Sequence, residues 1–155
     1  MSIERGLQYP YDVFPSPEWV GHLLIEAAEI TPKITCLETS AGLGHLACAL
    51  RNAGAEVFCI EPILDYQTLL TLQGFKVIGQ DFLTHTHLEN RFERIVQNPP
   101  FSLQISFVKK AFKCLKPQGK LVSLMSEYPW ISSSSKYQQF RAWCQSVNAI
   151  HQELP

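Results

Sequence analysis

The sequence lacks any strong excess of charge of one sign. Its net charge is -1, and charged residues make up 17% of the chain against 46% hydrophobic residues. These values argue against a protein that coats nucleic acid over its whole surface, and against a disordered one. Five lysines do cluster between residues 109 and 120, either as a local basic face or, as we prefer, as the solvated side of a helix and turn. At 155 residues, one globular domain is the natural expectation.

Paired cysteines and long apolar runs are also absent. The five cysteines are odd in number and far apart in sequence, and Cys36 and Cys59 fall inside apolar runs. This pattern is typical of buried thiols in a reducing compartment and argues against a disulfide framework. No run reaches the ~18 apolar residues that a membrane span needs, and the N-terminus has no signal pattern. We therefore expect a cytoplasmic protein with no membrane partner.

Metal-binding patterns are missing as well. His85 and His87 flank a threonine, but no cysteine or acidic residue stands at ligand spacing beside them. The other histidines are scattered along the chain. We therefore predict no metal site.

Short apolar segments alternate with segments of helical spacing along most of the chain. After an irregular arm over residues 1–15, Ser16 is expected to cap the first helix, and a capping-box pattern at Ser135 and Gln138 precedes the last one. The alternation predicts an α/β fold in a single domain over residues 1–155, with a mostly parallel sheet of about five strands and helices on both faces. We expect strands over residues 33–38, 56–60, 75–78, 92–97 and 120–125, and helices over residues 17–30, 44–53, 64–72, 102–115 and 135–147.

The segment Asn98-Pro99-Pro100-Phe101 follows the fourth expected strand, where ligands of open α/β sheets bind. Asn98 supplies a side-chain carbonyl, and Pro99 leaves its backbone carbonyl free to accept. Two consecutive prolines restrict the backbone that carries these acceptors. Phe101 offers a flat aromatic face, so the segment suits a planar group with a free NH2.

A glycine turn, LETSAGLGHL over residues 37–46, joins the first expected strand to the next helix. Gly42 and Gly44 allow a sharp turn and a close approach to a ligand, although a tight turn without a ligand would look the same. The segment also matches the dinucleotide pattern G-x-G-x-x-A. Glu38 would repel a pyrophosphate but would attract S-adenosylmethionine (SAM), which carries an ammonium and a sulfonium.

Two more acidic residues follow the second and third expected strands. Glu61 is placed to accept hydrogen bonds from both ribose hydroxyls, and its position one strand from the glycine turn favours this role over a plain strand-end carboxylate. Asp81 and Phe82 are placed to bind the adenine amine and to pack on the base, or else form an ordinary loop.

Taken in this order, these segments resemble the SAM-dependent methyltransferases of the NPPF adenine-methylating type, which have a Rossmann-like fold. The segment from Phe14 to Pro17 is similar to the family motif that closes over the methionine end of SAM, and Thr39 stands where the glycine motif usually has proline. The resemblance implies SAM as cofactor, bound by Phe14, Ser16, Pro17, Glu38, Ser40, Ala41, Gly42, Gly44, Glu61, Pro62, Asp81, Phe82 and Asn98.

The resemblance also implies a mechanism with Asn98, Pro99 and Phe101 as the catalytic residues. An aromatic amine is a poor nucleophile because its lone pair is delocalised into the ring. If Asn98 Oδ1 and the Pro99 carbonyl each accept one N–H, the lone pair becomes localised for attack on the methyl group. Phe101 would stack on the extruded base, and neither a metal nor a covalent intermediate is needed.

Family members normally continue past a Leu-Pro pair like Leu154-Pro155 into a final antiparallel hairpin. We therefore expect this hairpin to be missing and the side of the sheet beside the fifth strand to be an exposed edge. The last helix, a second copy of the chain or a separate recognition subunit would cover it. Tyr128, Pro129 and Trp130 either line the base pocket or serve as packing.

Several functions stay open. We prefer methyl transfer to an adenine amine in nucleic acid, with DNA favoured over RNA. The first alternative is methylation of a glutamine amide in a protein, although Phe101 in place of tyrosine favours a nucleobase. The second is a truncated, non-catalytic domain that binds SAM or a partner. Glu38 and the NPPF segment disfavour a nicotinamide-binding domain.

Overall fold

The structure is a computed structural model that describes residues 15–155, and Phe14 therefore lies outside the described residues. The contacts divide the chain into two compact units, of which the first ends at Leu124 and the second covers Met125–Pro155. The expectation of a single domain over residues 1–155 remains a prediction. Within the described part of the chain, no helix has both the length and the apolar character that a membrane span requires.

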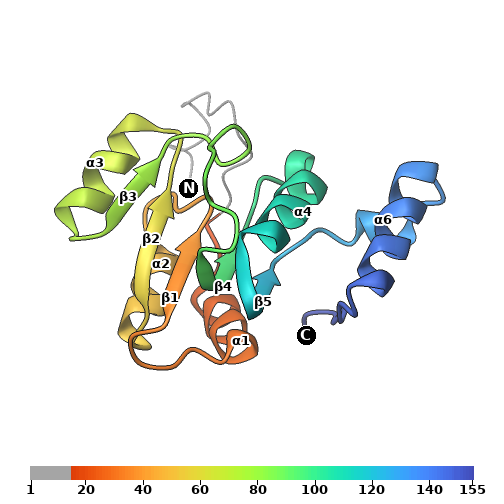
Figure 1. The fold of residues 1–155 in the computed structure, drawn as a ribbon, viewed down its shortest axis with the longest axis horizontal. Helices are drawn as coiled ribbons and strands as arrows, with labels where there is room; N and C mark the ends of the chain where they lie inside the picture. Colours follow the sequence, from red (N-terminus) through yellow and green to blue (C-terminus); the bar gives the residue numbers. More distant parts are fainter. Residues whose placement is uncertain (1–14) are drawn as a thin grey trace. The chain divides into compact units, whose positions relative to one another are not determined.

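The first unit is built on a five-stranded parallel sheet (Figure 1). The strand order is β3-β2-β1-β4-β5. The chain therefore builds outward from β1 to β3, and then returns to the other side of β1 to add β4 and β5. The carboxyl ends of β1 and β4 flank the point where the order reverses, which is where open α/β sheets bind ligands. The strands are β1 (Thr35–Glu38), β2 (Glu56–Ile60), β3 (Lys76–Gly79), β4 (Phe92–Gln97) and β5 (Leu115–Ser123).

Helices cover both faces of this sheet. Successive side chains of a strand point to opposite faces, so Cys36 belongs to one hydrophobic cluster and its neighbour Leu37 to the other. The first cluster receives side chains from α1 (Glu18–Ala28), α2 (His45–Asn52) and α3 (Leu64–Leu72). The second receives them from α4 (Gln104–Cys114), which follows the short 3-10 helix η2 (Phe101–Leu103). The predicted α/β fold is thus confirmed.

The thiols are part of this core. Cys36, Cys59 and Cys114 are buried and all five cysteines are free, as the sequence pattern indicates. Burial raises the pKa of Cys36 to about 12 and that of Cys114 to about 11. These thiols are therefore protonated packing groups at neutral pH.

The strand β5 begins earlier than predicted. Phe92 pairs with Leu115 and Arg94 pairs with Lys120, so residues 116–119 bulge out of the ladder between two paired positions. The predicted turn lies in this bulge, where Gln118 has a φ of 64°. Regular pairing then runs from Lys120 to Ser123. Among the described residues, β5 is the last strand of the sheet and pairs only with β4.

Two predicted helix caps are wrong. The N-cap residue of α1 is Pro17, and Ser16 makes no cap hydrogen bond because its hydroxyl instead contacts Asn98. The last helix, α6 (Ser135–Ser146), starts after Ser134 and has no side-chain cap. Gln138 donates instead to the carbonyl of Ser133, so the capping box does not form.

The second unit holds α5 (Tyr128–Ile131) and α6. Arg141 joins the two helices by donating to the carbonyls of Pro129 (2.6 Å) and Ser132 (2.9 Å). Trp130 stacks on His151, with ring centroids 4.0 Å apart, and also contacts Phe140. The aromatic segment after β5 therefore packs within its own unit.

Candidate functional site

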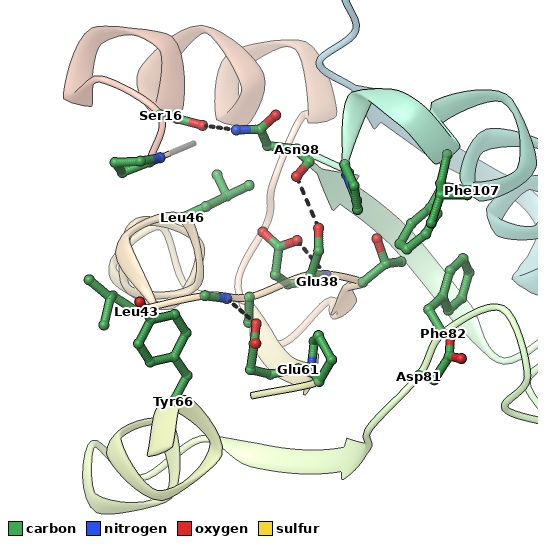
Figure 2. A pocket seen from close by; sticks show the side chains of 18 of the residues that line it. Ser16, Glu38, Leu43, Leu46, Glu61, Tyr66, Asp81, Phe82, Asn98 and Phe107 are labelled. Carbon is green, nitrogen blue, oxygen red and sulfur yellow. Dashed lines mark hydrogen bonds between the residues drawn. The ribbon is translucent and has the colours of Figure 1, made fainter. Parts of the chain in front are cut away.

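A pocket opens at the carboxyl ends of the strands in the first unit (Figure 2). Glu38 ends β1, Glu61 follows β2, Asp81 lies two residues after β3, and Asn98 follows β4. In a parallel sheet these ends meet at one edge, so the topology brings the four side chains to one pocket. The lining includes ten of the predicted cofactor residues: Ser16, Glu38, Ser40, Ala41, Gly42, Glu61, Pro62, Asp81, Phe82 and Asn98.

Four predicted site residues do not line this pocket. Pro17 is the N-cap residue of α1, and Pro100, not Pro99, belongs to the lining, although both prolines are buried. Phe101 is half-buried and begins η2. Gly44 has a φ of 89° and precedes α2, where a Cβ atom would lie 2.9 Å from Gln73 Oε1. The helix start and its packing therefore explain the glycine at 44 without a ligand.

Several lining residues were missed by the sequence reading. Leu43 and His45 belong to the glycine turn, and Gln80 precedes Asp81, so proximity in sequence could have found them. Others come from helices and had no local signal. The lining residues that were not predicted are Pro15, Thr39, Leu43, His45, Leu46, Tyr66, Gln80, Leu83, Pro100, Leu103 and Phe107.

Glu61 holds the glycine turn in place. Its Oε2 accepts a hydrogen bond from the backbone N–H of Gly42 (2.6 Å), and its Oε1 accepts one from the N–H of Ile63 (2.9 Å). Gly42 has a φ of 55°, a conformation that glycine adopts without strain. Glu61 thus connects two loops on the same side of the pocket, a structural role that the sequence did not indicate.

Two carboxyl groups of the pocket are buried. Glu38 is 1% exposed and Glu61 is 3% exposed. Burial raises the pKa of Glu38 to about 8, the nearby charge of Glu61 adds to this rise, and hydrogen bonds from the N–H groups of Ser40 and Thr39 partly oppose it. Burial also raises the pKa of Glu61, against the hydrogen bonds from Ile63 and Gly42. A cation that enters this pocket would favour the ionised form of both groups.

Hydrogen bonds fix the backbone and side chain of Asn98. Asn98 Nδ2 donates to Ser16 Oγ (2.8 Å), as Figure 2 shows. Ser40 Oγ donates to the Asn98 carbonyl (3.0 Å). One residue earlier, the buried Gln97 accepts from Thr39 Oγ1 (2.6 Å) and donates to Ser123 Oγ (3.1 Å). The ends of β1, β4 and β5 are therefore connected directly beneath Asn98.

Part of the pocket wall is aromatic. Phe82 is buried and packs against Phe107, with ring centroids 5.2 Å apart. The Asp81 carboxylate accepts from the N–H of Leu83 (2.9 Å). Lys110 of α4 donates to the carbonyls of Leu83 (2.9 Å) and His85 (2.5 Å), and its Nζ lies 5.2 Å from the centroid of the Phe82 ring. This loop is therefore anchored to α4.

No known protein-family profile matches the sequence. Among curated proteins, the chain is 31% identical over 116 residues to a probable ribosomal RNA small subunit methyltransferase A of Methanosarcina acetivorans, and the alignment covers 70% of this chain and 41% of that protein. The chain spans about two fifths of the length of the curated relatives it matches.

Solved methyltransferase structures share the fold. A putative RNA methyltransferase from Pyrococcus horikoshii superposes with a TM-score of 0.66 at 19% identity, over 88% of this chain and 71% of that chain. A putative SAM-dependent methyltransferase from Methanococcus maripaludis gives a TM-score of 0.58 at 12% identity, over 84% and 63%. The fold is therefore the Rossmann-like fold of these methyltransferase structures.

Among residues 15–155, no group of three or more His, Cys, Asp or Glu side chains is placed to hold a metal ion.

Proposed function

We propose that this chain is the SAM-binding catalytic domain of a methyltransferase that acts on an exocyclic adenine amine in RNA. The observation that carries the proposal is the arrangement of Glu38, Glu61, Asp81 and Asn98 at four neighbouring strand ends around one pocket. Each of these residue types suits a different part of the cofactor or substrate.

The charge of the pocket fits SAM. Glu38 and Glu61 are buried carboxyls that face one cavity, and a sulfonium and an ammonium would stabilise their ionised forms. A dinucleotide would instead bring a pyrophosphate to the glycine turn, where two acidic side chains offer an anion no favourable charge. The pocket therefore favours SAM over NAD on Coulomb grounds.

Different parts of the pocket would bind different parts of SAM. Glu61 remains able to accept from the ribose, because each carboxylate oxygen has two lone pairs and only one is used by a backbone N–H. Phe82 and Phe107 form an apolar wall suited to the adenine ring. Glu38 and Ser16 would face the methionine end.

Asn98 would hold the target amine. When bound, SAM supplies an electrophilic methyl group on a cationic sulfur. The Asn98 amide oxygen would accept one N–H of the amine, which localises the nitrogen lone pair for attack and stabilises the positive charge that develops on nitrogen. The prediction that the Pro99 carbonyl accepts the second N–H and that Phe101 stacks on the base remains part of this proposal. Positioning of the two reactants supplies the rest of the rate enhancement.

The choice of RNA is supported by the curated relatives, which are named as ribosomal RNA methyltransferases at 30–32% identity. The sequence pattern alone favoured DNA, because the NPPF resemblance was to DNA-methylating enzymes. The chain spans only part of these relatives, so its activity in the absence of any other chain remains a prediction. That a second copy of the chain or a recognition subunit covers the β5 edge also remains a prediction.

Transfer of tritium from labelled SAM tests the proposal. Small-subunit ribosomal RNA, DNA of the same sequence and a glutamine-bearing peptide are compared as acceptors, with the modified base identified by nuclease digestion and mass spectrometry. We expect methyl-adenine in the RNA alone, and loss of transfer with retained SAM affinity in Asn98→Ala. Tritium found in the DNA or the peptide, and not in the RNA, would show that this other acceptor is the substrate. SAM binding without transfer to any acceptor would favour a non-catalytic domain, and binding of NAD instead of SAM would overturn the assignment.

A further inference from the structure

The charged side chains are distributed unevenly along the chain. From Arg94 to Leu124, a stretch that holds most of β4 and all of α4 and β5, the sequence has no acidic residue. All 14 acidic residues therefore lie elsewhere, in a chain whose net charge is only -1. A chain that is nearly neutral as a whole thus has one strongly basic segment. Its basic residues are Arg94, Lys109, Lys110, Lys113, Lys116 and Lys120.

The half of the sheet that holds β1, β2 and β3 is acidic where it meets the pocket. Glu61 lines the pocket after β2, and Asp65 and Asp81 are exposed residues that follow β2 and β3. α3, which carries Asp65, contacts β3, whereas α4 contacts β5, so the two helices lie toward opposite edges of the sheet (Figure 1). Among the described residues, no lysine or arginine lines the pocket. A polyanion that approaches the pocket is therefore attracted toward α4 and not toward α3.

α4 begins at the pocket and carries lysines away from it. Phe107 of this helix lines the pocket wall, as Figure 2 shows. Lys109 and Lys113 are four residues apart, so they lie on one face of the helix, and their positions place that face away from Phe107. Lys113 and Lys116 are exposed, and Lys109 is half-buried. From Leu103, which also lines the pocket, to Lys113 the chain rises about 15 Å, the length of about four stacked nucleotides.

The acidic residues closest to these lysines lie at the end of α4 that is remote from the pocket. Within residues 15–155, neither Lys113 nor Lys116 forms an ion pair. The Glu93 carboxylate accepts from the N–H (2.8 Å) and the hydroxyl (3.0 Å) of Thr35, and these hydrogen bonds lower its pKa more than Lys116 does. Glu89 is exposed in the loop before β4. The charges of Lys113 and Lys116 are therefore not consumed by a carboxylate partner of this chain.

An exposed aromatic ring lies among the lysines. Phe112 is 42% exposed, precedes Lys113 and comes three residues after Lys109 on the same helix. Sites for single-stranded nucleic acid combine cations that contact the phosphates with aromatic side chains on which bases stack. The exposed face of α4 thus offers both kinds of group.

We propose that this face of α4, defined by Lys109, Phe112, Lys113 and Lys116, binds the phosphate backbone of a single-stranded segment of the RNA substrate. The proposal rests on the proposed function, which supplies RNA as the substrate. It places the RNA on the side of the pocket where Asn98 stands, because Asn98 follows β4 and leads directly into α4. Contacts with phosphates position the RNA without reading its sequence.

The simpler role for these lysines is to keep a helix end in solvent and to complement the helix dipole. Lys113 does lie in the last turn of α4, where a positive charge stabilises the helix. That role contributes to stability and leaves RNA binding unaffected. A phosphate contact instead contributes to RNA affinity and to its dependence on salt, because each contact releases a counterion from the RNA. The salt dependence of RNA binding therefore separates the two roles.

Two double variants with the same change of net charge provide the test. Lys113→Gln with Lys116→Gln neutralises the α4 face. Lys33→Gln with Lys76→Gln is the matched control, because these exposed lysines lie at the amino ends of β1 and β3, at the edge of the sheet opposite to the pocket. The probe is a fluorescently labelled, mixed-sequence single-stranded RNA oligonucleotide, and anisotropy gives its dissociation constant at several KCl concentrations.

We expect the α4 double variant to bind this RNA about 25-fold more weakly at 0.1 M salt, or about fivefold for each lysine. The slope of log affinity against log salt should become shallower by about 1.4, which is about 0.7 for each lost contact with a single strand. The control variant should keep both the affinity and the slope close to those of the unaltered chain. SAM affinity should stay unchanged in both, because none of the four lysines lines the pocket.

Two further variants examine the rest of the face. Lys113→Arg with Lys116→Arg keeps both charges and should retain the RNA affinity and the salt slope. Phe112→Leu keeps an apolar side chain but removes the ring, and should weaken RNA binding by at least about fivefold, the lower end of the range for one stacked base. Thermal unfolding of every variant identifies any loss of fold, and the arginine variant then carries the test of charge.

Equal affinities and equal salt slopes in the α4 and control double variants would overturn the proposal. An arginine variant that folds normally but loses RNA affinity as the glutamine variant does would also overturn it. If the RNA binds through these lysines but no acceptor is methylated, the proposed function fails and the binding surface stands. If ribosomal RNA is methylated with the same kcat/KM by both double variants, the function stands and this inference falls.

Discussion

The carboxylate of Glu61 accepts a hydrogen bond of 2.6 Å from the backbone N–H of Gly42, across 19 residues of sequence. This bond ties the loop after β2 to the turn after β1, so the acidic residue expected to recognise a ribose also shapes the turn that must admit the rest of the cofactor. Binding and local folding are therefore coupled at this position.

We predict that Glu61→Ala weakens SAM binding and destabilises the fold together. The substitution leaves the partly buried N–H groups of Gly42 and Ile63 without their acceptor, which costs about 1–3 kcal/mol for an unsatisfied buried group. Chemical denaturation and calorimetric SAM titration provide the two measurements. Glu56→Ala is the matched control, because that carboxylate is exposed and pairs with Lys76 at the far end of β2. A stable Glu61→Ala chain with full SAM affinity would contradict both roles.

The buried carboxyl of Glu38 predicts a fall of stability with rising pH. Burial raises its pKa from an ordinary 4.5 to about 8 in the folded chain. Below pH 4.5 the Glu38 carboxyl is protonated in both the folded and the unfolded chain. Between pH 4.5 and about 8 this carboxyl is ionised in the unfolded chain but stays protonated in the folded chain. The folded state then binds more protons, so the free energy of unfolding decreases as pH rises through this range and levels off above about 8.

Urea denaturation between pH 4.5 and 9 measures this dependence, and Glu38→Gln should flatten it. The free energy of unfolding of that variant will still decrease somewhat with rising pH, because burial also raises the pKa of Glu61. A cationic ligand favours the ionised carboxylate, so SAM affinity should increase with pH up to about 8, with release of a proton on binding. Calorimetry in buffers of different ionisation enthalpy detects the proton. SAM affinity that is independent of pH would exclude this coupling.

Lys110 provides a test of the adenine end of the pocket. Its ammonium group holds the carbonyls of Leu83 and His85 and lies over the Phe82 ring. Removing that charge in Lys110→Met should loosen the loop and weaken SAM binding by about three- to tenfold, the scale of one or two net hydrogen bonds. The rate at saturating SAM should stay nearly unchanged because Lys110 holds the loop proposed to bind the adenine of SAM, and not the group proposed to accept the target amine.

Lys113→Met is the matched control, since Lys113 is an exposed lysine of the same helix. Equal SAM affinities in the two variants would show that Lys110 does not organise this loop. A large fall in kcat for Lys110→Met, with SAM affinity retained, would place the loop near the reacting groups instead.

Much of this fold was predictable from the sequence, because its elements follow strong local rules. The bounds of α3, β2 and β4 agree with the predicted ranges 64–72, 56–60 and 92–97. Apolar runs between turn residues mark these strands, and a parallel sheet collects their carboxyl ends at one edge. That is why the sequence alone places Glu38, Glu61, Asp81 and Asn98 near one pocket.

The contacts that determine side-chain roles were not predictable, because they join residues with no local relationship. Ser16 looked like a helix cap, and only its approach to Asn98, 82 residues away, shows that its hydroxyl is used elsewhere. Tyr66 and Phe107 reach the pocket from helices whose spacing indicates only that they are helices. The bulge in β5 similarly depends on how Phe92 and Arg94 pair across the sheet.

Thr39 stands where the resembled glycine motif usually has proline, and the structure gives this departure a testable consequence. Its hydroxyl donates to the buried Gln97 at 2.6 Å, and Gln97 donates in turn to Ser123. Thr39→Val keeps the shape of the side chain but leaves Gln97 Oε1 without this donor. We therefore predict a loss of about 1–3 kcal/mol in the free energy of unfolding, the usual cost of an unsatisfied buried polar group.

Because Gln97 directly precedes Asn98, the same variant should also lower kcat more than it lowers SAM affinity. Denaturation and methyl-transfer assays measure the two effects. Thr68→Val is the control, because Thr68 is exposed on α3 and its hydroxyl donates to a carbonyl of its own helix. If Thr39→Val is as stable and as active as Thr68→Val, then the hydrogen bonds of Gln97 do not position Asn98, and its contacts with Ser16 and Ser40 and the two prolines hold this strand end instead.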